Sequence, residues 1–267
     1  MFGKSCSLIG VVHVHALPGS DGWAGQMDHL LAEAIFDALT FKEQGVDALI
    51  VENMHDVPYL KGYVEPETIA AMTVVANAVK YECMMPTGVQ ILAGANLEAL
   101  AVAAACDLDF IRVEGFVYAH VGDEGIHESC APKLLRKRAA SKADKVKIFA
   151  DIKKKHSSHA ITGDVSLVET ARTAEFFKAD GVIVTGDRTG DAPNPEDVKA
   201  VKEAVDIPVL VGSGATPDNI QNFMAYADAV IFGSYAKFDG DWRKRVDPER
   251  VKRLIDKARA QKRKSRK

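Results

Sequence analysis

The sequence predicts a single (β/α)8 TIM barrel, a closed parallel sheet in which a helix follows every strand. Three observations lead to this α/β fold class. The chain has 267 residues, close to the roughly 250 typical of one such barrel. Eight short apolar segments alternate with helical patterns along the whole chain, as expected for an α/β fold. The apolar segments are continuous, which indicates strands that are buried on both faces.

The eight expected strands are rich in β-branched residues. They cover residues 8–14, 48–52, 88–93, 110–114, 146–152, 181–185, 208–211 and 229–233. An open, doubly wound sheet of eight strands is the competing arrangement. Eight repeats of one β-then-α unit favour the closed barrel.

The expected helices fill the intervals between the strands. They cover residues 29–44, 67–81, 97–106, 132–142, 166–178, 195–205, 217–226 and 248–260. The first stops before Gly45, a residue suited to the left-handed turn after a helix. Three others begin at Pro195, Pro217 and Pro248, because proline fits the first helical position.

Loop lengths indicate which end of the barrel holds the functional site. Helix-to-strand connections are short, whereas the strand-to-helix segments 15–28, 53–66, 115–131 and 153–165 are long. Long loops on one rim mark the end where barrel active sites lie. No linker divides the chain, so we expect one domain over residues 1–267, with a basic tail at about 261–267.

Composition excludes several classes of protein. The formal net charge of −3 gives the barrel no reason to bind nucleic acid. The four cysteines show no CxxC or zinc spacing, which fits reduced thiols in the cytoplasm. The chain has no apolar run of about 18 residues and no room for a signal peptide before the first strand. We therefore expect a cytoplasmic protein without a transmembrane segment, and the basic tail leaves peripheral contact with an anionic membrane surface open.

Two glycine-rich turns late in the chain predict a phosphate site. Gly212, Ser213 and Gly214 follow the seventh expected strand, and Gly233 and Ser234 end the eighth. Glycine lets backbone N–H groups approach an anion closely. The loops after strands 7 and 8 commonly bind phosphate in barrels. The alternative is that these glycines only form tight turns.

Polar residues at the strand ends are candidates for catalysis and substrate binding. The expected catalytic residues are His13, His15, Glu52, Glu114, Asp151 and Lys153. The expected substrate-binding residues are Asn53, Arg112, Lys155 and Thr185. Inward charges at a barrel mouth must be paired to be tolerated, and such pairs shift pKa values in ways that suit acid–base chemistry.

Strand alternation predicts which of these side chains meet. Asp151 and Lys153 should point the same way. We therefore expect an ion pair between Asp151 and Lys153 and another between Glu114 and Arg112. A desolvated Lys153 is alternatively a Schiff-base nucleophile. A purely structural layer of salt bridges is the third interpretation.

The His13-x-His15 spacing also fits the opening of a metal-dependent hydrolase site, provided that both imidazoles point the same way. Such a site needs further imidazoles and a carboxylate on the last strand. That strand ends in Gly233-Ser234-Tyr235, which supplies no carboxylate. We predict no cofactor, and a divalent metal on His13 and His15 remains an alternative.

Several segments resemble the BtpA/SgcQ family over roughly residues 8–245. They are residues 8–19, 45–53, 150–157, 181–186 and 211–214. The most specific block is Asp151-Ile152-Lys153-Lys154-Lys155-His156. The resemblance implies a ribulose-phosphate-binding-type barrel and a family name tied to photosystem I biogenesis, although other members occur in organisms without photosynthesis. The acidic loop 120–129 does not match the family pattern.

The main functional hypothesis is an enzyme that acts on a small phosphorylated sugar or related metabolite by isomerase- or lyase-type chemistry. Asp151, Lys153 and Glu52 would transfer protons, and His13 or His15 would polarise a carbonyl or hydroxyl group. The phosphate would position the reacting end of the substrate. The alternatives are an assembly factor of the photosystem I biogenesis type and the metal-dependent hydrolase. We also expect a homo-oligomer.

Overall fold

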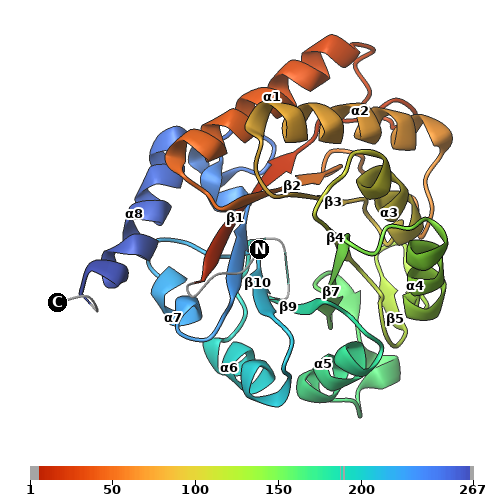
Figure 1. The fold of residues 1–267 in the computed structure, drawn as a ribbon, viewed down its shortest axis with the longest axis vertical. Coiled ribbons are helices and arrows are strands. Elements are labelled where there is room, and N and C mark those ends of the chain that lie inside the picture. Colours follow the sequence, from red (N-terminus) through yellow and green to blue (C-terminus); the bar gives the residue numbers. More distant parts are fainter. Residues whose placement is uncertain (1–5, 187, 189, 265–267) are drawn as a thin grey trace.

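Eight parallel strands form a closed barrel in the computed structural model, which describes residues 6–186, 188 and 190–264, with side chains to residue 260 (Figure 1). The strands are β1 (Ser7–His13), β2 (Ala48–Glu52), β3 (Thr87–Gln90), β4 (Phe110–Val113), β7 (Lys147–Ile152), β9 (Gly181–Thr185), β10 (Val209–Gly212) and β11 (Ala229–Phe232). Their order around the barrel is β1-β11-β10-β9-β7-β4-β3-β2. Since β1 pairs with both β2 and β11, the sheet is closed. The (β/α)8 prediction is confirmed and the open sheet is excluded.

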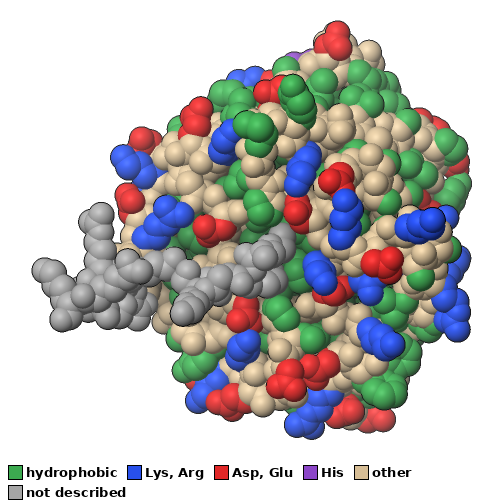
Figure 2. Space-filling model, viewed as in Figure 1, with side chains coloured by type: hydrophobic (Ala, Val, Ile, Leu, Met, Phe, Trp, Pro, Cys, Tyr) green, Lys and Arg blue, Asp and Glu red, His purple; other side chains and the backbone are tan. Residues whose placement is uncertain are grey.

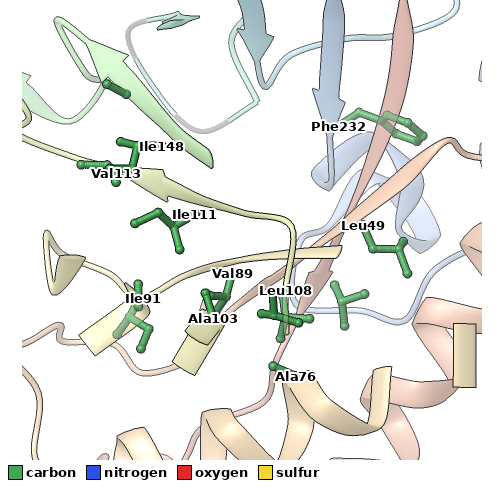
Figure 3. Close-up of a cluster of buried hydrophobic side chains, with 14 of the residues drawn as sticks. Leu49, Ala76, Val89, Ile91, Ala103, Leu108, Ile111, Val113, Ile148 and Phe232 are labelled. Atoms are coloured by element: carbon green, nitrogen blue, oxygen red, sulfur yellow. The ribbon is translucent and has the colours of Figure 1, made fainter. Parts of the chain in front are cut away.

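The helices form a ring outside the strands (Figure 1). They are α1 (Met27–Gln44), α2 (Pro66–Cys83), α3 (Asn96–Ala105), α4 (Ala131–Ala140), α5 (Leu167–Phe176), α6 (Pro195–Ala204), α7 (Ile220–Met224) and α8 (Pro248–Lys264). Apolar side chains fill the layer between strands and helices, where Val89 and Ile111 lie near Ala103 (Figure 3). In the part of the chain that the structure describes, no helix is both long and apolar enough to cross a bilayer.

Helix α7 begins later than predicted, at Ile220 instead of Pro217. The side chain of Asn219 explains the delay. Its Oδ1 accepts the Thr216 N–H at 2.8 Å and its Nδ2 donates to the Gly214 carbonyl at 2.9 Å. This side-chain turn competes with helical hydrogen bonds, so the helix starts only after it.

A small antiparallel sheet joins two of the long rim loops and was not predicted. It contains β6 (Gly125–His127), β5 (His120–Gly122) and β8 (Ser157–Ser158), in that order. Val121 pairs with Ser158, which connects the loop after β4 to the loop after β7. Strands of two or three residues are too short to show an alternating pattern, so the sequence gives no sign of them.

The barrel interior is apolar at the end where the strands begin. It holds Ile9, Val11, Ala48, Ile50, Phe110, Phe149, Ile183, Leu210, Ala229 and Ile231. The rings of Phe110 and Phe149 lie 5.3 Å apart. A Cβ on Gly88 would overlap the Phe110 ring, and one on Gly181 would lie 2.8 Å from Phe149. Two strand glycines therefore provide the space for two phenylalanine rings.

Charged side chains of both signs are interspersed on the face shown in Figure 2. This distribution agrees with the formal net charge of −3. It shows no continuous basic stripe on that face, the feature that would favour nucleic-acid binding.

Candidate functional site

The inward-facing positions change from apolar to polar along several of the strands. Ile50 is followed two residues later by Glu52, and Phe149 is followed by Asp151. Side chains two residues apart share one face of a strand, so a polar layer caps the apolar interior at the carboxyl ends. We call this layer, with the adjoining loop residues, the mouth cluster. Its members are His13, Glu52, Gln90, Arg112, Glu114, Asp151 and Lys155.

Arg112 and Asp151 form a buried two-point ion pair at the centre of the mouth cluster. Arg112 Nε lies 3.1 Å from Asp151 Oδ1, and Arg112 Nη2 lies 3.0 Å from Oδ2. Burial alone would lower the pKa of Arg112, but the charges of Asp151 and Glu52 raise it. The guanidinium therefore stays charged. The predicted pair between Glu114 and Arg112 is wrong. Arg112 lies opposite Phe149 in the register of β4 and β7, and its guanidinium binds Asp151, two residues further along β7. Glu114 pairs with Lys154 instead.

The three consecutive lysines after β7 go to three different places. Strand β7 ends at Ile152, and Lys153 adopts a φ of +44°. Its Nζ donates to the Thr162 carbonyl at 3.2 Å. The Lys154 ammonium lies 3.5 Å from Glu114 Oε2, and both side chains are buried. The predicted ion pair between Asp151 and Lys153 is therefore wrong, because the left-handed turn ends the alternation.

Lys155 is the lysine that faces the mouth cluster. Its backbone N–H donates to the Thr185 hydroxyl at 3.2 Å, which fixes the loop against β9. Burial and the Arg112 charge lower the pKa of its half-buried amine, against the opposing effect of Glu52 and Asp151. The sequence prediction placed Lys155 among the substrate-binding residues and Lys153 among the catalytic ones. In the structure, Lys155 lies near the charges of Arg112, Glu52 and Asp151, whereas Lys153 bonds to the Thr162 carbonyl.

Glu52 is the carboxyl group best suited to hold a proton in the mouth cluster. It is buried at the end of β2. Burial raises its pKa, and the nearby Arg112 only partly opposes this effect. A carboxyl group with a raised pKa can act as a general acid near neutral pH.

His13 is buried and held in one tautomer. Its Nδ1 lies 3.0 Å from the Trp242 carbonyl oxygen, which can only accept, so Nδ1 carries the hydrogen. Burial and the Lys237 charge lower its pKa, so the ring is neutral. Its Nε2 faces Gly233, where a Cβ would lie 2.7 Å away. Sequence reasoning found His13 but missed Trp242, which lies far away in the chain.

His15 lies outside the mouth cluster. It is exposed, and its ring stacks on His55 with centroids 4.8 Å apart. Strand β1 ends at His13, so strand alternation no longer sets the direction of the His15 side chain. That both imidazoles point the same way stays a prediction. Within residues 6–186, 188 and 190–260, no group of three or more His, Cys, Asp or Glu side chains is placed to hold a metal ion. The proposed metal pair of His13 and His15 thus has no geometric support.

The two glycine loops lie side by side on the rim. Strands β10 and β11 are parallel neighbours, and the Ser213 N–H donates to the Ile231 carbonyl at 3.2 Å. This bond commits the Ser213 amide to the sheet, and its hydroxyl lies 3.4 Å from the Asp191 carbonyl. The N–H groups of Gly214 and Ser234 donate to no other described residue. These two amides are therefore not committed to a hydrogen bond with the described residues.

Gly212 and Gly214 need to be glycine for different reasons. A Cβ on Gly212 would lie 3.3 Å from Arg112 Nη2 and would also clash with Ile183. Gly214 has a φ of +72°, and a Cβ there would overlap the backbone of Ala192. Neighbouring atoms therefore leave no room for a side chain at either position in this part of the rim. Whether the loops also bind phosphate stays a prediction.

A cavity of about 210 Å³ lies on the rim beside β2 and β3. Asn53 and Tyr59 both line it. The Asn53 amide accepts the Leu92 N–H at 2.8 Å and donates to Asp56 at 3.0 Å, so it fastens two loops together. Burial and the charge of Glu52 raise the pKa of Tyr59. Sequence reasoning predicted Asn53 but missed Tyr59, which no motif marks.

The small sheet contains a histidine cluster that sequence reasoning also missed. The rings of His120 and His127 are parallel with centroids 4.9 Å apart, and His159 lies 5.5 Å from His120. His120 is buried, and its Nε2 makes no hydrogen bond to the described residues. Burial and the nearby Lys154 lower its pKa to about 3.

We expect His120→Gln to weaken the loss of stability in acid. An unfolded histidine, with a pKa of about 6.5, binds a proton as pH falls below that value, whereas folded His120 stays neutral down to about pH 3. Above pH 6.5 this histidine is neutral in both states and does not change the free energy of unfolding with pH. Between pH 6.5 and 3 only the unfolded state binds the proton, so the free energy of unfolding falls as the pH falls. Between pH 7.5 and 5.5 the free energy of unfolding of the wild type should fall by about 1.4 kcal/mol more than that of the variant. Urea unfolding at both pH values measures this difference, and equal losses would contradict it.

The fold defines the chain as a (β/α)8 barrel, and solved barrels superpose on it. Thiamine phosphate pyrophosphorylase from Pyrococcus furiosus superposes with a TM-score of 0.59 at 15% identity, covering 95% of this chain and 96% of that one. Orotidine 5'-phosphate decarboxylase from Pyrococcus horikoshii gives 0.57 at 14% identity, covering 94% and 99%. These likenesses establish the fold.

The chain belongs to the BtpA family, whose match covers residues 4–260. An uncharacterized mitochondrial protein of Caenorhabditis elegans is 44% identical over 253 residues, covering 93% of this chain and 91% of that protein. An uncharacterized protein of Pyrococcus horikoshii is 41% identical, with coverages of 92% and 93%. The photosystem I biogenesis protein BtpA of Synechocystis is 36% identical, with coverages of 93% and 86%.

Proposed function

We propose that this protein is an enzyme that acts on a small phosphorylated sugar or related metabolite by acid–base chemistry of the isomerase or lyase type. The main supporting observation is the mouth cluster, where buried proton-transfer groups lie beside two loops with uncommitted amides. The superposed barrels are named for phosphorylated compounds, which favours a substrate of that class. The expected cytoplasmic location and homo-oligomeric state remain predictions.

Each member of the mouth cluster has a distinct proposed role. Glu52 donates and recovers a proton, because burial keeps its carboxyl group protonated more readily than usual. Asp151 holds the Arg112 guanidinium in place, and Arg112 stabilises negative charge that develops on the substrate oxygen. His13 accepts a hydrogen bond from a substrate hydroxyl through Nε2. Gly214 and Ser234 bind the phosphate through their amides.

Phosphorylated sugars should stabilise the protein, whereas the matching unphosphorylated sugars should not. A ligand at a hundred times its dissociation constant adds about 2.7 kcal/mol to the free energy of unfolding. Thermal unfolding with a panel of three- to six-carbon sugar phosphates measures this effect. Ser234→Asp places a negative charge in the loop and should abolish the stabilisation. The matched change Ser158→Asp, at an exposed position on β8, should preserve it.

The proposal would fail if no phosphorylated compound raised the unfolding temperature. It would also fail if Ser158→Asp removed the effect as completely as Ser234→Asp, since the loss would then be a general charge effect.

A second candidate function is assembly of a larger complex, favoured by the name of the Synechocystis relative. That relative is linked by name to photosystem I, whereas others come from a nematode and an archaeon, which have no photosystem. A role in photosystem assembly is therefore not shared by the whole family. The basic tail on which this hypothesis also rests lies at about 261–267, outside the described side chains.

A further inference from the structure

The amine of Lys155 stands apart from its two neighbours in the lysine block. Lys153 donates to a backbone carbonyl, and Lys154 forms a buried ion pair with Glu114. Lys155 Nζ makes no hydrogen bond or ion pair to any residue in the described ranges. A partly buried lysine amine without a partner among the described residues is unusual, because a buried cation needs a counter-charge within contact distance.

The surroundings of this amine suit a neutral nucleophile. Charges from Arg112, Glu52 and Asp151, at the ends of β4, β2 and β7, all act on it. The Arg112 cation and the partial burial both favour loss of the Lys155 proton. Neutral lysine amines in such sites attack carbonyl carbons. The Lys155 side chain is only partly buried.

The position of Lys155 relative to the glycine loops also fits a short carbonyl compound. Strand β7 lies two places from β10 in the barrel order β10-β9-β7. Neighbouring strands are about 4.8 Å apart, so the two strand ends are separated by roughly 10 Å. The long lysine side chain covers much of that distance. A carbonyl a few bonds from a bound phosphate therefore comes within its reach.

We propose that Lys155 forms a Schiff base with the aldehyde or ketone carbon of a small phosphorylated ligand. This inference rests on the proposed function of the mouth cluster. The amine nitrogen attacks the carbonyl carbon, and the C=O electron pair moves to oxygen to give a carbinolamine. A proton from Glu52 lets that oxygen leave as water while the nitrogen lone pair forms the C=N bond. Amine, carbonyl and one proton thus give a protonated imine and water, and hydrolysis reverses each step.

Reductive trapping tests the inference directly. The full-length protein is incubated with dihydroxyacetone phosphate or glyceraldehyde 3-phosphate, reduced with sodium cyanoborohydride and mapped by peptide mass spectrometry. We expect one dominant adduct on Lys155, at least tenfold above the mean labelling of the other lysines. Unphosphorylated dihydroxyacetone and glyceraldehyde should label it more weakly. Lys155→Met and Lys155→Arg should lose the adduct, and Lys153→Met should keep it.

The outcomes separate this inference from the proposed phosphate site. Equal labelling of Lys155 by phosphorylated and unphosphorylated compounds would support the Schiff base and count against the phosphate loops. Thermal stabilisation by the phosphorylated compounds without a reducible adduct on Lys155 would overturn the Schiff base and leave the phosphate site standing. Adducts spread evenly over the surface lysines would also overturn it. Lys155→Arg retains the positive charge, so a folded variant without the adduct isolates the chemistry of the amine.

Discussion

Replacing Asp151 by alanine is expected to lower the free energy of unfolding by about 3–5 kcal/mol. Asp151 and Arg112 are buried to 2% and 4% side-chain exposure, and they form a two-point ion pair. Without the carboxylate, the guanidinium loses its direct counter-charge in a site with little water. Urea unfolding at pH 7 measures the loss.

Two companion variants test the cause of this destabilisation. The double variant Arg112→Met with Asp151→Leu removes both charges and should recover most of the lost stability, because a buried pair replaced by apolar groups is often neutral. Asp107→Asn breaks a pair between exposed side chains and should have a far smaller effect. A loss below about 1 kcal/mol for Asp151→Ala would mean that Glu52 alone compensates Arg112, contrary to our description.

Replacing Phe110 by alanine is expected to lower the free energy of unfolding by about 3–5 kcal/mol. The Phe110 ring is fully buried inside the barrel, against Phe149 and over Gly88. Alanine leaves a cavity that the closed sheet cannot collapse to fill. Phe176→Ala is the matched control, because that ring is 82% exposed and should change stability by less than about 0.5 kcal/mol.

Gly88 provides an independent check of the same packing. Gly88→Ala should destabilise the wild type, because its Cβ would overlap the Phe110 ring. In the Phe110→Ala background the same change fills part of the cavity and should cost much less. Simple additivity of the two losses would contradict the direct contact between the two positions.

The fold was predictable because its signals are repeated eight times. Continuous apolar strands, proline helix starts and the long loops on one rim all agree with a closed barrel, and the structure confirms it. Local side-chain bonding was less predictable. Asn219 delays the start of helix α7 by hydrogen bonding to Thr216 and Gly214. The hydrophobic periodicity of the sequence does not predict such a turn.

The site was predictable only as far as the strands extend. Strand alternation correctly predicts that Glu52, Arg112 and Asp151 point into the barrel, because they lie within regular strands. It fails at Lys153, where a left-handed residue changes the direction of the chain. The pairing of Arg112 with Asp151 depends on the register between β4 and β7, which one sequence does not specify.

The pairing of Val121 with Ser158 couples the two neighbouring rim loops that follow β4 and β7, so that they move together. Lys155, the lysine proposed to be reactive, is three residues from Ser158. A displacement of the hairpin formed by residues 120–127 would therefore move Lys155 as well. An insertion or a charge change in the hairpin would then change the reactivity of the Lys155 amine without altering any group that contacts the ligand. Family members that differ there would differ in ligand preference even when their inner residues are identical.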